Sequence, residues 1–205
     1  MEVIRHDWWA TPVWQFRLDT INPSDVERDC YRYESNRNDK LLLSQSNIRN
    51  QTDLNSSSLR MNLDWRTNDT YPNIKKMLFE VEKQAPGLYE EFGVKKIFKQ
   101  QIDNYWVNFN KQGMFNKPHL HPNSIFTGVY YAKAEKNCGN IVIHNSADKE
   151  FTLQSYTDKP NKFNMSNPAY EPSPGLVIIF PSWLQHSVES NYSGTDRVSV
   201  SFHFN

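Results

Sequence analysis

The sequence lacks the features that mark several common classes of protein. Lysine and arginine together number 23, as do aspartate and glutamate, so there is no basic excess of the kind that general nucleic-acid binders carry. No uninterrupted apolar run reaches the roughly 18 residues that a membrane-spanning helix needs. Glu2, Arg5 and Asp7 also interrupt the apolar stretch that a signal peptide requires. We therefore expect no membrane partner and no general nucleic-acid binding.

Cysteine is scarce as well. Cys30 and Cys138 are the only two in the chain, and their separation matches no metal-ligand spacing. Such low usage is typical of a protein from a reduced compartment, which predicts a cytoplasmic location. The length of 205 residues allows one domain with a substantial buried core.

The first part of the chain predicts a strand followed by helices. Residues 10–18 alternate weakly in polarity, which indicates a strand. Asn22 followed by Pro23 is typical of a helix start, because asparagine can cap the first turn and proline is tolerated there. Apolar residues at helical spacing predict a second helix over 74–85, which the Pro-Gly pair at 86–87 should end.

The pattern changes after Gly93 to short β-prone runs separated by turn residues. These runs cover residues 98–109, 124–132, 140–144, 151–155, 176–180 and 198–204. They predict a mainly β fold, either a sandwich or a barrel, whose outer face the preceding helices could brace. Between the two predicted helices, polar residues dominate 36–69, which predicts a long irregular segment that could cover a site as a lid.

A pair of histidines separated by one residue provides the first candidate site. Alternate side chains of an extended chain point the same way, so His119 and His121 project in one direction. Two neutral imidazoles on one face form half of a site suited to Fe, Zn, Cu or Ni. An isolated pair of this kind can equally be two half-exposed histidines with no ligand.

Two later segments add to this pair. An apolar strand at 176–180 leads to Pro181, and a short bend then returns His186 toward the same core, where it could complete a metal-binding face. Arg197 and Ser199 share one side of the last strand. A buried arginine is costly unless it meets an anion, and its guanidinium matches a carboxylate with two parallel hydrogen bonds. Taken singly, the histidine could be a core residue and the arginine could pair with an acidic side chain.

Together these blocks resemble the 2-oxoglutarate/Fe(II) oxygenases of marine phages and bacteria. The likeness extends from about Trp106 to the C-terminus and rests on four stretches in the family's order: 119–124, 127–131, 175–186 and 197–202. It implies a double-stranded β-helix, a jelly-roll or cupin-like fold of two facing sheets. It also implies a single domain over 1–205, with the strand, helices and lid in 1–93 and the catalytic core in 94–205. If a phage encodes the chain, the cytoplasm concerned is that of the host.

The resemblance also implies two cofactors, Fe(II) and 2-oxoglutarate, and the residues that hold them. Three side chains would bind the iron: His119, His121 and His186. Three others would hold the far carboxylate of 2-oxoglutarate: Arg197, Ser199 and Tyr131, the last at the position of a tyrosine that prolyl hydroxylases use. Asn116 and Asn108 are further candidates for the pocket. The implied reaction hydroxylates an unidentified small-molecule or peptidyl substrate and releases succinate and CO2.

One ligand departs from the common pattern. Most such oxygenases carry Asp or Glu where this chain has His121, which gives two histidines and one carboxylate. Three neutral ligands leave the charge of the ferrous ion unbalanced, but the two carboxylates of 2-oxoglutarate could balance the pocket as a whole. A carboxylate from elsewhere, such as Asp103 or Glu189, is the alternative third ligand.

Two other classes stay open at this stage. The spacing of Gly113 and Gly175 relative to the histidines resembles the two cupin motifs, which would indicate a metalloenzyme that uses no 2-oxo acid. Cupins, however, add a glutamate after the histidine pair, where this chain has Ile125 and Phe126, and they do not need Arg197. The remaining class is a non-enzymatic β-sandwich binding module whose histidines are incidental or hold a structural metal.

Overall fold

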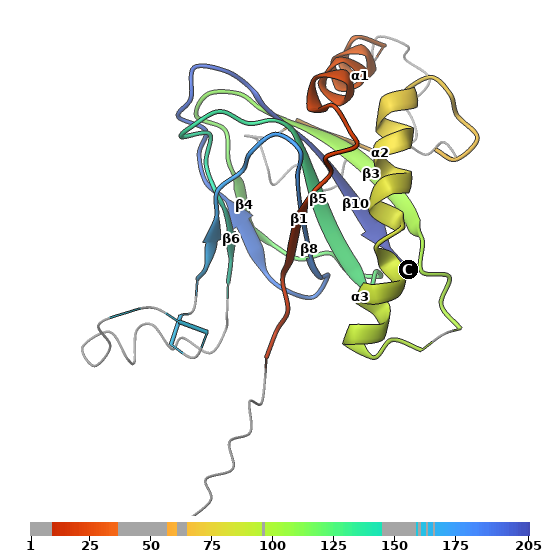
Figure 1. The fold of residues 1–205 in the computed structure, drawn as a ribbon. Coiled ribbons are helices and arrows are strands. Elements are labelled where there is room, and N and C mark those ends of the chain that lie inside the picture. Colours follow the sequence, from red (N-terminus) through yellow and green to blue (C-terminus); the bar gives the residue numbers. More distant parts are fainter. Residues whose placement is uncertain are drawn as a thin grey trace, which may run out of the picture.

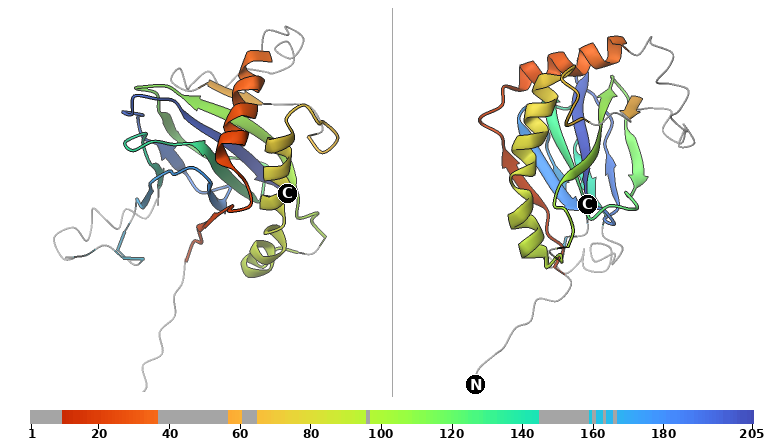
Figure 2. Two further views of the ribbon diagram at one scale, coloured as in Figure 1. Left: turned by 45° about the horizontal axis from the view of Figure 1, so that its top comes forward. Right: turned by 90° about the vertical axis from the view of Figure 1, so that its right-hand side faces the viewer.

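The computed structural model describes residues 10–36, 57–60, 65–95, 97–144, 159, 161–162, 164–165 and 167–205, with the backbone alone at 57–60. Two antiparallel sheets face each other, and three helices cover the outer face of one of them (Figure 1). The views in Figure 2 show the same layering from two other directions. The prediction of a mainly β protein with N-terminal helices is confirmed.

The larger sheet contains six strands in the order β1-β8-β5-β10-β3-β2. Their bounds are β1 Trp14–Arg17, β2 Ser57–Arg60, β3 Ile102–Asn110, β5 Phe126–Lys133, β8 Leu176–Pro181 and β10 Arg197–Phe204. The smaller sheet contains four strands in the order β4-β9-β6-β7. Their bounds are β4 Asn116–His119, β6 Ile141–Ile143, β7 Ala169–Tyr170 and β9 His186–Val188.

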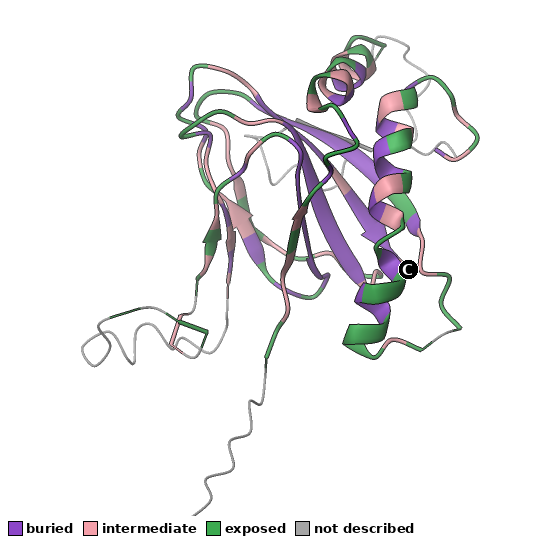
Figure 3. Ribbon diagram, in the orientation of Figure 1, coloured by how far each residue is buried: buried purple, intermediate pink, exposed green. Residues whose placement is uncertain are grey.

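Strand alternation divides the larger sheet into an apolar outer face and a mixed inner face. On β10, Val200 and Phe202 belong to the apolar core beneath the helices, whereas Ser199 and His203 point between the sheets. A second apolar cluster, which includes Tyr131, fills part of the space between the sheets. Figure 3 shows these central strands as mostly buried and the outer faces of the helices as exposed. The interior between the sheets is therefore where polar side chains can gather.

Helix α1 (Pro23–Ser35) begins as the sequence predicts. The side chain of Asn22 accepts a hydrogen bond from the backbone N–H of Ser24 at 3.1 Å. Helix α2 (Pro72–Glu82) covers most of the second predicted helix, but its first turn receives no cap from its own N-cap side chain. Instead, the buried carboxylate of Asp29 on α1 accepts from the N–H groups of Asn73 and Ile74, at 2.7 and 3.3 Å. Asp29 thus caps one helix from another.

The Pro-Gly pair at 86–87 was expected to end a helix, and this expectation is wrong. The structure shows a new helix there, α3 (Ala85–Phe92), with the proline in its first turn, where the missing N–H is not needed. The helix ends at Gly93, whose positive φ of 75° supplies the left-handed cap that glycine adopts most easily.

The polar stretch 36–69 is not irregular throughout. Its residues 57–60 form β2, which pairs with β3 at the edge of the larger sheet. Residues 37–56 and 61–64 lie outside the described part of the chain, so the predicted lid is not tested, and the same holds for the expected strand at 151–155. In the ranges that the structure describes, no helix has the length and apolar character needed to cross a membrane.

Candidate metal and cosubstrate site

Three histidines from two strands and a loop converge between the sheets. His119 ends β4 and His186 begins β9, and these two residues are paired across the smaller sheet. His121 follows in the loop after β4, where its backbone N–H donates to the carbonyl of Ser182 at 2.9 Å. One ligand atom from each of the three side chains lies within 4.8 Å of the other two. The structure therefore brings together the three histidines nominated from the sequence.

The hydrogen bonds of the two strand histidines leave the same ring nitrogen available on each. Nδ1 of His119 lies 2.7 Å from the carbonyl oxygen of Lys117, and Nδ1 of His186 lies 3.0 Å from that of Leu184. A neutral imidazole that donates from Nδ1 keeps its lone pair on Nε2. Burial, together with the nearby charge of His119, lowers the pKa of His186 to about 3, so its ring is neutral at neutral pH.

The spacing of the nitrogens suits a single ion. Nε2 of His121 and Nε2 of His186 face each other at 3.2 Å. Two nitrogens that each lie about 2.1 Å from one ion are about 3.0 Å apart at a right angle and about 3.4 Å apart at the tetrahedral angle. The observed distance falls between these values, so the rings have the separation of ligands that share one cation.

The alternative carboxylate ligands lie elsewhere. Asp103 accepts a hydrogen bond from the side chain of Asn205, and Glu189 accepts one from the backbone N–H of Asn140 at 3.0 Å. Among the residues that the structure describes, no carboxylate joins the histidine group. The geometry thus favours His121, rather than Asp103 or Glu189, as the candidate third metal ligand.

Arg197 is a buried cation that forms no direct ion pair with a described carboxylate, although the charge of Glu189 acts on it from a longer distance. Its side chain is 1% exposed, and burial lowers the pKa of its guanidinium. Nη1 donates to the backbone carbonyls of Cys138 and Gly139, the latter at 2.8 Å. Nη2 has no hydrogen-bond partner, and no described carboxylate forms an ion pair with it. A buried guanidinium in this state fits a carboxylate that arrives from outside the chain.

Tyr131 and Ser199 lie next to this guanidinium in the sheet. The register pairs Ser199 on β10 with Tyr131 on β5 and with Asn108 on β3, so the three side chains share one face. Burial raises the pKa of Tyr131, which therefore keeps its phenolic proton and can donate it. The amide of Asn108 donates to the hydroxyls of Ser201 and Ser199, at 2.9 and 3.4 Å. This layer offers hydroxyl and amide groups without a negative charge.

Asn116 lies at the Arg197 end of the same interior. Its side-chain oxygen accepts from the amide of Asn110 at 3.1 Å, and Asn110 is the strand partner of Arg197. Asn116 and Asn108 therefore both line the space between the sheets, as the sequence suggested. What any of these residues binds stays a prediction.

Three rings that contact the histidines were not assigned a role from the sequence. The ring of His203 lies 4.9 Å from that of His121, Trp106 lies 5.4 Å from His121, and Phe180 lies 4.8 Å from His186, all between ring centroids. The sequence feature that could have identified His203 is its spacing from Arg197: the two residues are an even number of positions apart on one strand, so their side chains share a face. No local pattern marked the tryptophan, because its place depends on how β3 pairs with β10.

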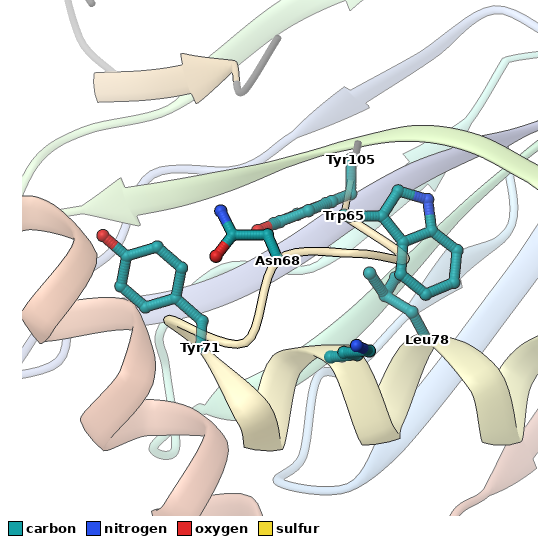
Figure 4. A pocket seen from close by; sticks show the side chains of 6 residues that line it. Trp65, Asn68, Tyr71, Leu78 and Tyr105 are labelled. Carbon is teal, nitrogen blue, oxygen red and sulfur yellow. The ribbon is translucent and has the colours of Figure 1, made fainter. Parts of the chain in front are cut away.

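A small cavity lies on the far side of the larger sheet from the histidines, under the helices. It has a volume of about 10 Å³ and is lined by Trp65, Asn68, Tyr71, Lys75, Leu78 and Tyr105 (Figure 4). This is room for about one water molecule. Tyr105 and Leu78 belong to the core beneath the helices, so this cavity is separate from the histidines.

Three histidines whose ligand atoms converge and a buried guanidinium, both between two facing antiparallel sheets, are the arrangement expected of a double-stranded β-helix metalloenzyme. Residues 104–203 match the model of a family described as "Putative 2OG-Fe(II) oxygenase". The matching segment, 100 of the 205 residues, carries every candidate site residue. The predicted enzyme class and the cofactors Fe(II) and 2-oxoglutarate are thereby confirmed at the level of the family. A marine or phage origin stays a prediction.

Solved structures confirm the fold. A prolyl hydroxylase from Trichoplax adhaerens, in complex with a hypoxia inducible factor peptide fragment, is 12% identical with a TM-score of 0.60, over 94% of this chain and 83% of that one. A prolyl-4-hydroxylase from Pseudomonas putida is 13% identical with a TM-score of 0.58, over 95% and 94%. An oxidoreductase of the 2OG-Fe(II) oxygenase family from Burkholderia pseudomallei is 16% identical with a TM-score of 0.53, over 73% of this chain and 66% of that one, just under two thirds. No curated protein sequence matches the chain significantly.

Proposed function

We propose that this protein is an Fe(II)- and 2-oxoglutarate-dependent dioxygenase that hydroxylates a C–H bond of its substrate. Bound iron and 2-oxoglutarate supply the oxidising chemistry: one O2 is consumed, 2-oxoglutarate becomes succinate and CO2, and one oxygen atom enters the C–H bond. The observation that carries the proposal is the pairing of three converging imidazoles with a buried guanidinium that has an unused donor. The match of residues 104–203 to the oxygenase family model supports the same chemistry.

Each residue of the site has a defined task in this proposal. The triad of His119, His121 and His186 holds the ion, with Nδ1 of the two strand histidines fixed by backbone carbonyls. Arg197 takes the far carboxylate of 2-oxoglutarate on its free Nη2, and the hydroxyls of Tyr131 and Ser199 add hydrogen bonds. The walls of the interior exclude water from this end, because Arg197 and Tyr131 are both almost fully buried.

The substrate of the proposed reaction is a small molecule or a peptidyl side chain. Asn108 and Asn116 supply amide groups in the interior, which suit hydrogen bonds to an uncharged part of the cosubstrate or substrate. Two of the fold relatives are named as prolyl hydroxylases, and one of them is in complex with a peptide fragment. These names are the support for a peptidyl side chain as one of the two substrate classes. The cytoplasmic location also stays a prediction, supported by two buried, unpaired cysteines.

The buried guanidinium separates this proposal from its main rival. A cupin-like metalloenzyme without a 2-oxo acid would use the histidines but leave the buried Arg197 without a direct ion-pair partner among the described residues. Leaving a buried charge uncompensated costs several kcal/mol, on the order of 3–5 when a partner is removed. A cosubstrate carboxylate would provide the direct ion pair that the described residues, with Glu189 acting only from a longer distance, do not form.

Uncoupled turnover tests the proposal without knowledge of the substrate. We expect the Fe(II)-loaded protein to release succinate slowly from 2-oxoglutarate in the presence of O2, faster when a library of metabolites and peptides contains the substrate. Arg197→Ala should weaken 2-oxoglutarate binding by about 100-fold or more, the cost of truncating one partner of a buried charge pair. Arg28→Ala, which removes an exposed arginine of α1, is the matched control and should bind normally. Metal binding with no succinate release in any condition would instead support the cupin-like enzyme.

A further inference from the structure

The ring of His121 is packed among four other rings. Its centroid lies 5.1 Å from His119, 5.0 Å from His186, 5.4 Å from Trp106 and 4.9 Å from His203. The first two are its partners in the histidine triad. The other two contact each other edge to face at 4.7 Å, and each is 7% exposed. His121 therefore lies against a buried pair of rings that does not belong to the triad.

His121 differs from its two partners in the element that carries it. His119 and His186 lie in paired strands, and a backbone carbonyl contacts Nδ1 of each ring. His121 lies beyond the end of β4, in a loop whose backbone bonds to the turn after β8. A side chain on a loop is held less precisely than one on a strand unless neighbouring side chains restrict its rotation.

The pair formed by Trp106 and His203 is a rigid support. The two residues lie on β3 and β10, adjacent strands at the centre of the larger sheet. Their sequence neighbours Val107 and Phe202 are fully buried in the core beneath the helices, which fixes the backbone on both strands. His203 itself is not part of the group whose ligand atoms converge. It contacts the rings of Trp106 and His121, and through these contacts it can act on the site.

We propose that Trp106 and His203 are positioning residues, which set the orientation of the His121 imidazole and adapt this site to a histidine as third ligand. A carboxylate is short, and hydrogen bonds usually fix it, whereas an imidazole presents flat faces that aromatic neighbours can clamp. The T-shaped contact with His203 at 66° and the tilted contact with Trp106 at 43° restrict rotation of the His121 ring on the side of the larger sheet. The inference rests on the proposed function, because it takes His121 to be a ligand.

Binding of Co(II), which gives a visible spectrum that depends on ligand geometry, tests the role of His203 without turnover. We expect His203→Ala to weaken Co(II) binding by about 10- to 100-fold, the usual loss when a residue that orients a metal ligand is removed, and to change the spectrum. His203→Phe keeps an aromatic ring in the same place and should bind Co(II) within about threefold of the wild type. His144→Ala is the matched control, because this histidine contacts Asn167 and Ser187 and does not belong to the group of converging ligand atoms.

A double-mutant cycle separates a specific effect from general damage to the fold. If His203 acts through His121, then His203→Ala should cause no further loss of Co(II) affinity in a protein that already carries His121→Ala. Circular dichroism and the melting temperature identify any variant that fails to fold, and the Phe variant then carries the test. Additive losses in the cycle, an unchanged spectrum in His203→Ala, or a loss in His203→Phe as large as in His203→Ala would each overturn the inference.

The same measurements show whether the proposed function has failed instead. If the wild type binds no Co(II), or if His121→Ala binds it as tightly as the wild type does, then the proposed ligand set is wrong. If His121→Ala weakens binding but His203→Ala leaves it unchanged, then the ligand set stands and the inference about His203 is wrong.

Discussion

At the scale of single residues, the interior of this protein combines two kinds of polar group that are costly to bury alone. His186 avoids the cost by staying neutral, since burial lowers its pKa to about 3. Arg197 cannot lose its proton at any ordinary pH, and its two carbonyl contacts use only Nη1. A ligand that supplies a carboxylate would accept a hydrogen bond from the remaining donor, Nη2, and this would offset the cost of burying the guanidinium.

Tyr131 should contribute a measurable but modest part of cosubstrate affinity. Tyr131→Phe removes one hydroxyl donor beside the guanidinium and leaves the ring packed. A net loss of about 1 kcal/mol for one hydrogen bond predicts roughly fivefold weaker binding of 2-oxoglutarate. Anaerobic calorimetry in the presence of Fe(II) measures it. Tyr192→Phe, at a side chain that is 75% exposed, is the control, and equal affinities of the two variants would remove Tyr131 from the site.

The residue scale also shows what the sequence could and could not predict of the site. His119, His121, His186 and Arg197 were found because their order and spacing match a family pattern. Trp106 carries no such signal: it becomes a neighbour of His121 only through the pairing of β3 with β10. Contacts that depend on which strands pair are set by the whole chain, and no local motif records them.

At the scale of elements, the turn before β6 supplies the backbone carbonyls that accept hydrogen bonds from the Arg197 guanidinium. The carbonyls of Cys138 and Gly139 both accept from its guanidinium, and Gly139 has a φ of 88°. A Cβ at this glycine would lie 2.3 Å from the carbonyl oxygen of Glu189. The turn and the chain after β9 are thus pressed together, and only glycine fits between them.

Replacing this glycine should therefore disturb the cosubstrate site as well as stability. Gly139→Ala forces a positive φ on alanine and a clash with backbone, which we expect to cost about 1–3 kcal/mol of unfolding free energy. Because the turn carries two carbonyl partners of Arg197, 2-oxoglutarate affinity should fall too, while metal affinity stays within a few fold. Gly194→Ala is the matched control, since nothing lies within 4 Å of its Cβ position. Urea denaturation and calorimetry give the two quantities, and normal 2-oxoglutarate binding in Gly139→Ala would argue against this role of the turn.

The contact between α1 and α2 provides a second prediction at this scale. Asp29→Ala leaves two backbone N–H groups of α2 without their buried acceptor, and we expect it to destabilise the protein by about 1–3 kcal/mol. Asp25→Ala removes a partly exposed carboxylate whose ion pair with Arg28 is worth little, and it should change stability by less than about 1 kcal/mol. Equal losses in the two variants, measured by urea denaturation, would contradict the capping role of Asp29.

Prediction of the elements from the sequence succeeded where a run was long and apolar. The run at 176–180 became β8 almost unchanged, and Asn22 caps α1 as expected. The strands that carry the histidines were not predicted, because β4 and β9 have four and three residues and contain proline, lysine and serine. Their strand conformation comes from pairing with each other and not from their own β propensity.

At the scale of the whole molecule, the order of the sheets assembles the site from distant segments. β10, the last strand in the chain, lies between β5 and β3, and the histidine strands face it from the smaller sheet. The helices cover the outer face of the larger sheet, and the space between the two sheets holds the polar side chains of the site beside the second apolar cluster. The assignment of residues 1–205 to a single domain stays a prediction, although one apolar cluster contains residues from all three helices and the larger sheet.

An ion held between the two sheets should stabilise the whole fold. Metal at about 100 times its Kd adds about 2.7 kcal/mol of stability, which corresponds to a rise in Tm of about 5–11 °C for a chain of this size. Adding EDTA should return the Tm to that of the metal-free protein. His186→Ala should show no metal-dependent rise, whereas His144→Ala should keep it. A wild-type Tm that is insensitive to Fe(II), Co(II) and EDTA would contradict a metal between the sheets.

The most direct test of the account is an anaerobic titration of the Fe(II)-loaded protein with 2-oxoglutarate, followed by visible absorption. If the three imidazoles hold the ion and Arg197 holds the far carboxylate, a charge-transfer band should appear and saturate at about one equivalent, and Arg197→Ala should weaken it greatly. No band in a protein that binds iron, or a band of equal strength and affinity in Arg197→Ala, would contradict the central claim.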